Sequence, residues 1–107
     1  MDYQDANLEI IIQKLKAKYS PLRLFLHGSR ANGTAKPDSD YDFVMVLSDF
    51  EKSNRHQMMS TIAKDFYDLN LQVQVWTYSL AEFNDWKDEF SSIPETALNT
   101  GKEINLD

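Results

Sequence analysis

The chain has 107 residues, which favours a single small domain with one core over residues 1–107. Its formal net charge of −6 argues against long nucleic acid as the main partner, because that kind of binding depends on basic side chains. The absence of cysteine excludes disulfides and thiolate metal sites. No apolar run approaches the roughly 18 residues that cross a bilayer, and the first residues lack a signal-peptide pattern, so we expect a cytoplasmic protein.

The first half of the chain predicts a helix, two strands and a loop between them. Apolar residues recur at helical spacing over 5–19. A short apolar run over 22–27 indicates a buried strand, and a second strand is expected over 41–47. The segment 28–39 is expected to be a loop with one helical turn after its first glycine.

The second half continues the alternation of helix and strand. Its clearest local signal is Ser79-Leu80-Ala81-Glu82, which is a capping box. The expected elements are a helix over 53–69 capped by Ser53, a strand over 71–78, a helix over 80–90, a short helix from Pro94 to Gly101 and an edge strand over 103–106. The order predicts an α/β or α+β domain, in which helices flank a small mixed β-sheet.

A glycine and a serine follow directly after the first predicted strand. Gly28 allows a sharp turn and a close approach of the backbone to a ligand. The amides beyond it can point at an anion, and the hydroxyl of Ser29 can donate to a phosphate oxygen. Arg30 adds a nearby positive charge. Taken alone, the pair is also compatible with an ordinary strand-to-helix turn.

Two aspartates mark the start of the second predicted strand. Asp40 and Asp42 are two positions apart, so on a strand their side chains share a face and lie about 7 Å apart. Two carboxylates at that spacing can hold one divalent cation, or a pair of cations as in two-metal phosphoryl transfer. Taken alone, this pattern is also compatible with a polar turn.

The two motifs together resemble the signature of the DNA polymerase beta-like nucleotidyltransferase superfamily. The matching residues are Phe25-Leu26-His27-Gly28-Ser29-Arg30-Ala31-Asn32-Gly33 and Ser39-Asp40-Tyr41-Asp42-Phe43-Val44-Met45-Val46. The variant with Gly-Ser-Arg-Ala-x-Gly and Ser-Asp-x-Asp-Phe is similar to the minimal nucleotidyltransferases of prokaryotes. The resemblance therefore implies a polymerase beta-like nucleotidyltransferase fold.

The resemblance also assigns roles to residues of the two motifs. Gly28 and Ser29 would bind the β- and γ-phosphates of a nucleotide, and Asp40 and Asp42 would ligate Mg²⁺, with a two-ion site expected. Arg30 and Gly33 would shape the nucleotide-binding loop, and Arg30 would lie either near the phosphates or in a structural position. Ser39 is expected as a cap ahead of the acidic strand, and Lys36 as a solvated charge.

The chain departs from the family pattern on the third strand. Family enzymes place a third carboxylate there, and the matching position in this chain is Gln74, with Gln72 on the same face. An amide offers a carbonyl oxygen but cannot act as a base. Three alternatives stay open: a slow enzyme, another acid that moves in, or a binding module that kept the nucleotide site. Asp65 and Asp68 are expected as surface charges rather than as that acid.

The resemblance implies transfer of a nucleoside monophosphate, AMP from ATP, to a hydroxyl of a partner protein. Minimal nucleotidyltransferases are often paired with a helical HEPN protein as the antitoxin of a toxin–antitoxin pair. We therefore expect an NTP substrate, a helical HEPN-type partner, and homo- or hetero-oligomers. The alternative is a catalytically weak or inactive nucleotide-binding module that acts by binding a helical partner.

The remaining candidate residues are expected to have structural roles. His27, at the end of the first strand, is interpreted as a hydrogen-bonded wall residue, and His56 as a solvated one. Trp76, Trp86 and Phe90 are expected to pack in the core or half-buried, rather than to form a ligand shelf.

Overall fold

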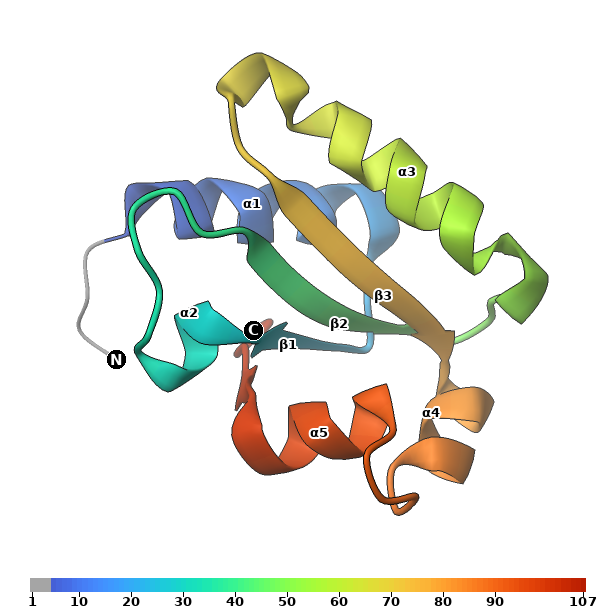
Figure 1. Cartoon of the computed structure of the whole chain (residues 1–107). Helices are drawn as coiled ribbons and strands as arrows, with labels where there is room; N and C mark the ends of the chain where they lie inside the picture. Colours follow the sequence, from blue (N-terminus) through green and yellow to red (C-terminus); the bar gives the residue numbers. More distant parts are fainter. Residues whose placement is uncertain (1–4) are drawn as a thin grey trace.

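Four strands form one mixed sheet in the order β3-β2-β1-β4 in a computed structural model that describes residues 5–107 (Figure 1). β1 pairs antiparallel with β2 and with β4, and β2 pairs parallel with β3. The strands are β1 (Arg23–His27), β2 (Tyr41–Leu47), β3 (Val73–Ser79) and β4 (Lys102–Glu103). The prediction of a small mixed sheet flanked by helices is confirmed, although the edge strand is shorter than expected.

Two helices cover one face of the sheet, α1 (Ala6–Tyr19) and α3 (Arg55–Asp65) (Figure 1). Asp5 caps α1 by accepting a hydrogen bond from the amide of Leu8, and Ser20 ends the helix in a left-handed conformation. The buried side chains of this layer come from both helices and from alternate strand positions. They include Ile11, Leu15, Leu26, Phe43, Met45, Ile62, Phe66 and Val75.

The opposite face is covered by α4 (Leu80–Trp86) and α5 (Ile93–Thr100) (Figure 1). The rings of Phe25 and Phe83 stack there with their centroids 5.5 Å apart. Ser79 and Ser92 cap the two helices through their hydroxyl groups. This second cluster is smaller than the first, and it is made of Phe25, Val44, Val46, Tyr78, Phe83 and Ala97.

The helix expected over 53–69 is broken into three pieces. A 3-10 turn over Lys52–Asn54 precedes α3, and a second one over Tyr67–Leu69 follows it. Ser53 lies inside the first turn and caps nothing, so that prediction is wrong. Phe66 leaves the helix at φ −111° and is buried in the core together with Ile62 of α3.

The helix expected over 80–90 ends at Trp86. Only half of its capping box forms, because the carboxylate of Glu82 pairs with Arg55 instead of the Ser79 amide. Trp86 and Phe90 are 47% and 91% exposed, so the expectation that they pack in the core or half-buried is wrong for both, whereas Trp76 is partly buried as expected. Within residues 5–107, no helix is both long enough and apolar enough to cross a membrane.

Candidate active site

The sheet register brings three side chains from three strands into one row. Asp42 on β2 lies opposite His27 on β1 and opposite Gln74 on β3. Residues that are in register across neighbouring strands point to the same face of a sheet. We call these three residues, together with Asp40 just before β2, the acidic row.

Gly28 brings the loop after β1 against this row. It has φ +73°, and a Cβ atom built on it would lie 2.7 Å from Oδ2 of Asp42. Only glycine allows both this backbone conformation and this approach of the carboxylate. The short helix α2 (Ser29–Asn32) follows, and its hydrogen bonds begin with the amides of Ala31 and Asn32 donating to the carbonyl of Gly28. The amides of Ser29 and Arg30 therefore precede the bonded part of the helix.

The carboxylate of Asp42 is half-buried and poorly compensated. Burial raises its pKa, the neighbouring Asp40 raises it further, and His27 opposes the rise. No side chain within residues 5–107 donates a hydrogen bond to it. A cation at this position would relieve both the desolvation of the carboxylate and its repulsion by Asp40.

His27 lies beside Asp42 without the hydrogen bond that we expected of a wall residue. Its Nε2 atom is buried and has no partner among the described residues. Burial lowers the pKa of this imidazole, and Asp42 opposes that effect. The interpretation as a hydrogen-bonded wall residue is therefore wrong for this nitrogen, whereas His56 is exposed as expected.

The donor atoms of the acidic row are compatible with a metal ion that is completed by its substrate. In the described part of the chain, no three His, Cys, Asp or Glu side chains cluster as a metal site. Asp40 and Asp42 offer carboxylate oxygens, and Gln74 offers an amide oxygen. Mg²⁺ is commonly bound through one or two carboxylates together with phosphate oxygens. The row therefore suits an ion that arrives with a triphosphate better than a metal held permanently by protein ligands.

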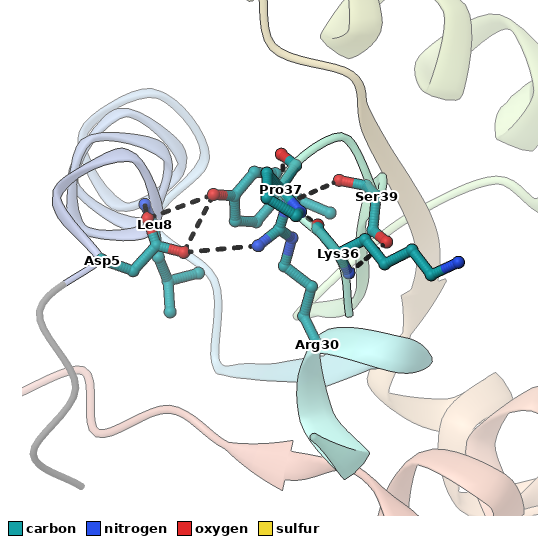
Figure 2. A network of polar contacts seen from close by, with 7 residues as sticks. Asp5, Leu8, Arg30, Lys36, Pro37 and Ser39 are labelled. Atoms are coloured by element: carbon teal, nitrogen blue, oxygen red, sulfur yellow. Dashed lines mark hydrogen bonds and ion pairs between the residues drawn. The ribbon is translucent and has the colours of Figure 1, made fainter. Parts of the chain in front are cut away.

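Arg30 is committed to contacts within the fold, as Figure 2 shows. Its Nη2 atom donates to the carbonyl of Ser39 at 2.8 Å, and it also contacts the carbonyls of Lys36 and Pro37 at 3.2 and 3.3 Å. Its Nη1 atom lies 3.8 Å from the carboxylate of Asp5. Of the two positions that the sequence left open for Arg30, the structural one agrees with these contacts.

Asp5 and Tyr41 complete this cluster, and sequence reasoning did not single out either residue. The hydroxyl of Tyr41 donates to Asp5 at 2.9 and 3.1 Å, and the guanidinium of Arg30 lies 3.9 Å from the centre of the Tyr41 ring. We call Asp5, Arg30, Ser39 and Tyr41 the Arg30 cluster. In the sequence, Asp5 was only the first residue of the helix predicted over 5–19, which carries no information about a partner 36 residues away.

The other residues of the loop have local roles. The hydroxyl of Ser39 accepts a hydrogen bond from the amide of Lys36 at 2.8 Å and closes the turn before the acidic strand. Lys36 itself is exposed, as expected. Gly33 ends α2 at φ +83°, a left-handed conformation that favours glycine.

Comparisons with known proteins agree with the fold and with the motifs. The family model described as nucleotidyltransferase domain matches residues 8–102. A chain in a crystal structure of the toxin–antitoxin pair MntA–HpeT, a mutant in which two aspartates are replaced by glutamates, has a similar fold with a TM-score of 0.52. That match has 16% sequence identity and covers 94% of this chain and 72% of that chain. No curated protein matches the sequence.

The structural match shows the fold alone, since its sequence identity is low. The family match covers most of the chain and includes both motifs, the glycine turn and the pair of aspartates. The polymerase beta-like fold predicted from the resemblance is confirmed. The chain therefore belongs to the nucleotidyltransferase domain family.

Proposed function

We propose that this chain transfers AMP from ATP to a hydroxyl of a partner protein in a Mg²⁺-dependent reaction. The observation that carries this proposal is the contact of the glycine turn with the acidic row. A Cβ atom on Gly28 would lie 2.7 Å from the Asp42 carboxylate, so the expected phosphate-binding turn and the expected metal ligand meet in space. Had the two motifs pointed apart, they could not have held one nucleotide.

The phosphates of the nucleotide would lie at the β1 end of the acidic row. Gly28 gives the chain its close approach there, and the hydroxyl of Ser29 would donate to a phosphate oxygen. Gly33 would shape the loop by ending α2. Arg30 would act at a distance from the phosphates, by holding the carbonyl of Ser39 and thereby the start of the acidic strand.

Asp40 and Asp42 would hold the magnesium ions, with the carbonyl oxygen of Gln74 as a weaker neutral donor. When bound, these ions would supply charge neutralisation on the phosphates and on the attacking and leaving oxygens. Half-burial of Asp42 and the neighbouring Asp40 both disfavour its charged form, and a bound cation would offset both effects.

In the proposed reaction, the acceptor oxygen forms a bond to the α-phosphorus while the bond from that phosphorus to the pyrophosphate breaks. The attack is in line, so the acceptor and the leaving pyrophosphate lie on opposite sides of the phosphorus. Gln74 cannot take the proton of the acceptor hydroxyl, so that proton passes to solvent or to a group of the partner. We expect the absence of a third carboxylate to slow the enzyme.

We further propose that the acceptor belongs to a helical HEPN-type protein and that the two form a toxin–antitoxin pair in the cytoplasm. The resemblance to minimal nucleotidyltransferases supports this, and the MntA–HpeT structure is described as a toxin–antitoxin pair. The net charge of −6 agrees with a protein partner rather than with long nucleic acid.

A second candidate function is binding without catalysis. The amide at position 74 supports it, because it removes a charged ligand and a base from the site at once. In that case the chain would bind nucleotide and partner, and contact alone would neutralise the partner. The two functions differ in a covalent product.

Labelled ATP separates these functions. The chain and its partner are incubated with ATP carrying the label on the α-phosphate, and in parallel on the γ-phosphate, with and without Mg²⁺. Nucleotidyl transfer predicts that only the α-label appears on the partner, and only with metal. A stable complex without any label would favour binding alone. If calorimetry detects no metal-dependent ATP binding by the chain, both functions are contradicted.

A further inference from the structure

The connection between α4 and α5 presents two aromatic side chains to solvent. Phe90 is 91% exposed, and Trp86, the last residue of α4, is 47% exposed. This connection is drawn in orange near the lower edge of Figure 1, beyond the end of β3. We call residues 85–90 the aromatic turn. Aromatic side chains are enriched in the centres of protein interfaces, where their burial contributes much of the binding energy.

Hydrogen bonds hold the aromatic turn in one conformation. The carbonyl of Trp86 accepts hydrogen bonds from the amide of Glu89 at 2.9 Å and from the hydroxyl of Ser92 at 2.6 Å. Ser91 has φ +66°, which few residues other than glycine adopt, and its amide donates to the carboxylate of Glu95 at 3.2 Å. The rings are therefore presented by an ordered segment, which lowers the entropic cost of binding a partner there.

Negative charge surrounds the two rings. Asp85, Asp88 and Glu89 are exposed, and none of them forms an ion pair with another residue in 5–107. Residues 80–100 contain five acidic side chains and one basic one, Lys87, so this fifth of the chain carries a net charge of −4 out of −6. A surface that covers the aromatic turn must therefore supply positive charge as well as apolar contacts.

The same charge disfavours three other occupants of the aromatic turn. Nucleic acid and anionic lipid surfaces carry negative charge of their own and would be repelled. A second copy of this chain that docked turn against turn would bring two segments of net charge −4 together. A protein surface with lysines or arginines has no such penalty.

We propose that the aromatic turn is the docking site for the partner protein, an inference that rests on the proposed function for the existence of that partner. The complementary surface is apolar at its centre and bordered by lysines or arginines. Phe90 and Trp86 contact the apolar centre, while Asp85, Asp88 and Glu89 pair with the basic border.

This docking site leaves the acidic row open. Gln74 lies near the start of β3, whereas α4 follows directly after Ser79, five residues further on, or about 17 Å along the strand. Asp42 shares its sheet face with Val44, which packs in the cluster under α4 and α5. A partner held at the aromatic turn would thus lie on the face that carries the acidic row, without occupying the row. Substitutions in the turn should raise the partner concentration needed for labelling and leave ATP binding unchanged.

Three synthetic peptides test the chemistry of the docking site without any nucleotide. The first is an amphipathic helix of leucine and lysine, roughly 18 residues long, which exceeds the length at which isolated helices are marginal. In the second every lysine is replaced by glutamate, and in the third every leucine is replaced by glutamine. NMR titrations follow the indole N–H of Trp86 and the ring of Phe90. Only the leucine–lysine peptide should give saturable shifts there, with an affinity at least about tenfold above that of the other two.

Matched variants separate the aromatic turn from the rest of the surface. Phe90→Ser should weaken binding of the leucine–lysine peptide at least about fivefold. Tyr67→Ser, which removes a 67% exposed ring from a different turn, should not change it. The double variant Asp88→Asn/Glu89→Gln should weaken binding and reduce its dependence on salt, whereas Asp68→Asn should do neither. Circular dichroism checks that each variant is folded.

Four results would overturn the docking site. They are equal binding of the leucine–lysine and leucine–glutamate peptides, unchanged binding by Phe90→Ser, shifts at Tyr67 instead of Trp86, and self-association of the wild-type chain that Phe90→Ser abolishes. The last result, measured by analytical ultracentrifugation, would assign the turn to a second copy of the chain. None of these results depends on whether the chain binds ATP, and calorimetry of the wild-type chain with ATP and Mg²⁺ tests the proposed function independently.

Discussion

The Arg30 cluster and the acidic row contain carboxylates in opposite conditions. The carboxylate of Asp5 in the Arg30 cluster accepts hydrogen bonds from Leu8 and Tyr41 and faces a guanidinium. The carboxylate of Asp42 is half-buried beside a second carboxylate, with no donor side chain among the described residues. The charge of the Asp5 carboxylate is compensated within the chain, although the buried Nε atom of Arg30 has no hydrogen-bond partner among the described residues. The second carboxylate has no such compensation, and the proposed Mg²⁺ would relieve both its burial and its repulsion by Asp40.

The largest expected effect follows from removing the charge of the uncompensated carboxylate. Asp42→Asn should reduce nucleotidyl transfer at least about 100-fold, the scale observed when one preorganised electrostatic group is lost from an active site. The same change should raise the melting temperature, because it removes a charge that burial disfavours. Labelling of the partner and thermal unfolding measure the two effects. Asp38→Asn, an exposed acid of the same loop, is the control, and a fully active Asp42→Asn would rule out the mechanism.

The contact between the glycine turn and the acidic row can also be broken by a substitution at the glycine. Gly28→Ala should abolish metal-dependent ATP binding, because its Cβ would displace the Asp42 carboxylate. Its backbone conformation, φ +73° and ψ −152°, is essentially restricted to glycine and should add a cost of about 1–3 kcal/mol to folding. Gly33→Ala shares the positive φ but has nothing within 4 Å of its Cβ, so it should lose stability and weaken ATP binding much less than Gly28→Ala does. If calorimetry gave the same ATP affinity for both variants, the contact between Gly28 and Asp42 would be unimportant for binding.

Adding a carboxylate to the acidic row should increase the uncompensated negative charge there and leave the Arg30 cluster unchanged. Gln74 lies opposite Asp42, so Gln74→Asp adds a third charge beside it. For a weakened enzyme we expect a gain in transfer rate of about tenfold or more, below the roughly 100-fold or greater effect of a well-placed general base, together with tighter metal binding. Gln57→Asp, on the exposed surface of α3, controls for the added charge. A lower rate in Gln74→Asp would favour the function of binding alone.

Substitutions in the Arg30 cluster should lower the free energy of unfolding. Arg30→Met removes a guanidinium whose side chain is only 14% exposed and leaves Asp5 without its cation. Breaking a buried ion pair costs about 3 kcal/mol, so we expect a loss near that value in urea denaturation. Lys18→Met, which breaks an exposed pair with Asp65, should have a far smaller effect, because exposed ion pairs contribute little to stability. Similar losses in the two variants would show that the Arg30 cluster does not support the fold.

These two regions also differ in how far the sequence could predict them. The strand over 41–47 has the predicted bounds, because its apolar run and the polar turn before it are local signals. The row of Asp42 and Gln74 followed from strand spacing and from the family pattern. The Arg30 cluster joins residues 5, 30 and 41, and no local pattern indicates contacts over such separations.

Long-range contacts also explain the errors in the predicted helices. Glu82 fits a capping box in the sequence, yet its carboxylate pairs with Arg55, 27 residues earlier. Phe66 fits a helical stripe and is buried as that stripe predicts, yet the helix ends one residue before it, and no local pattern indicated that end. Phe90 shows the reverse error, because hydrophobicity alone does not tell which apolar side chains stay outside.

The smallest expected effect concerns the pH dependence of stability. The raised pKa of Asp42 means that the folded state binds this proton more tightly than the unfolded state does. The free energy of unfolding should therefore fall as pH rises from the ordinary aspartate range through the raised folded pKa. Urea denaturation across that range should show this fall in the wild type and a flatter profile in Asp42→Asn.

Glu103 provides a carboxylate of opposite sign for the same measurement. A hydrogen bond from Arg23 lowers its pKa, so its contribution to stability is present above the ordinary glutamate value and is lost as pH falls through the lowered folded pKa. Glu103→Gln should remove only that acidic loss. Saturating ATP with Mg²⁺ should move the Asp42 part of the profile to lower pH, because a nearby cation favours the carboxylate, and should leave the Glu103 part in place. A ligand that moved both parts equally would be acting on the whole fold rather than on the acidic row.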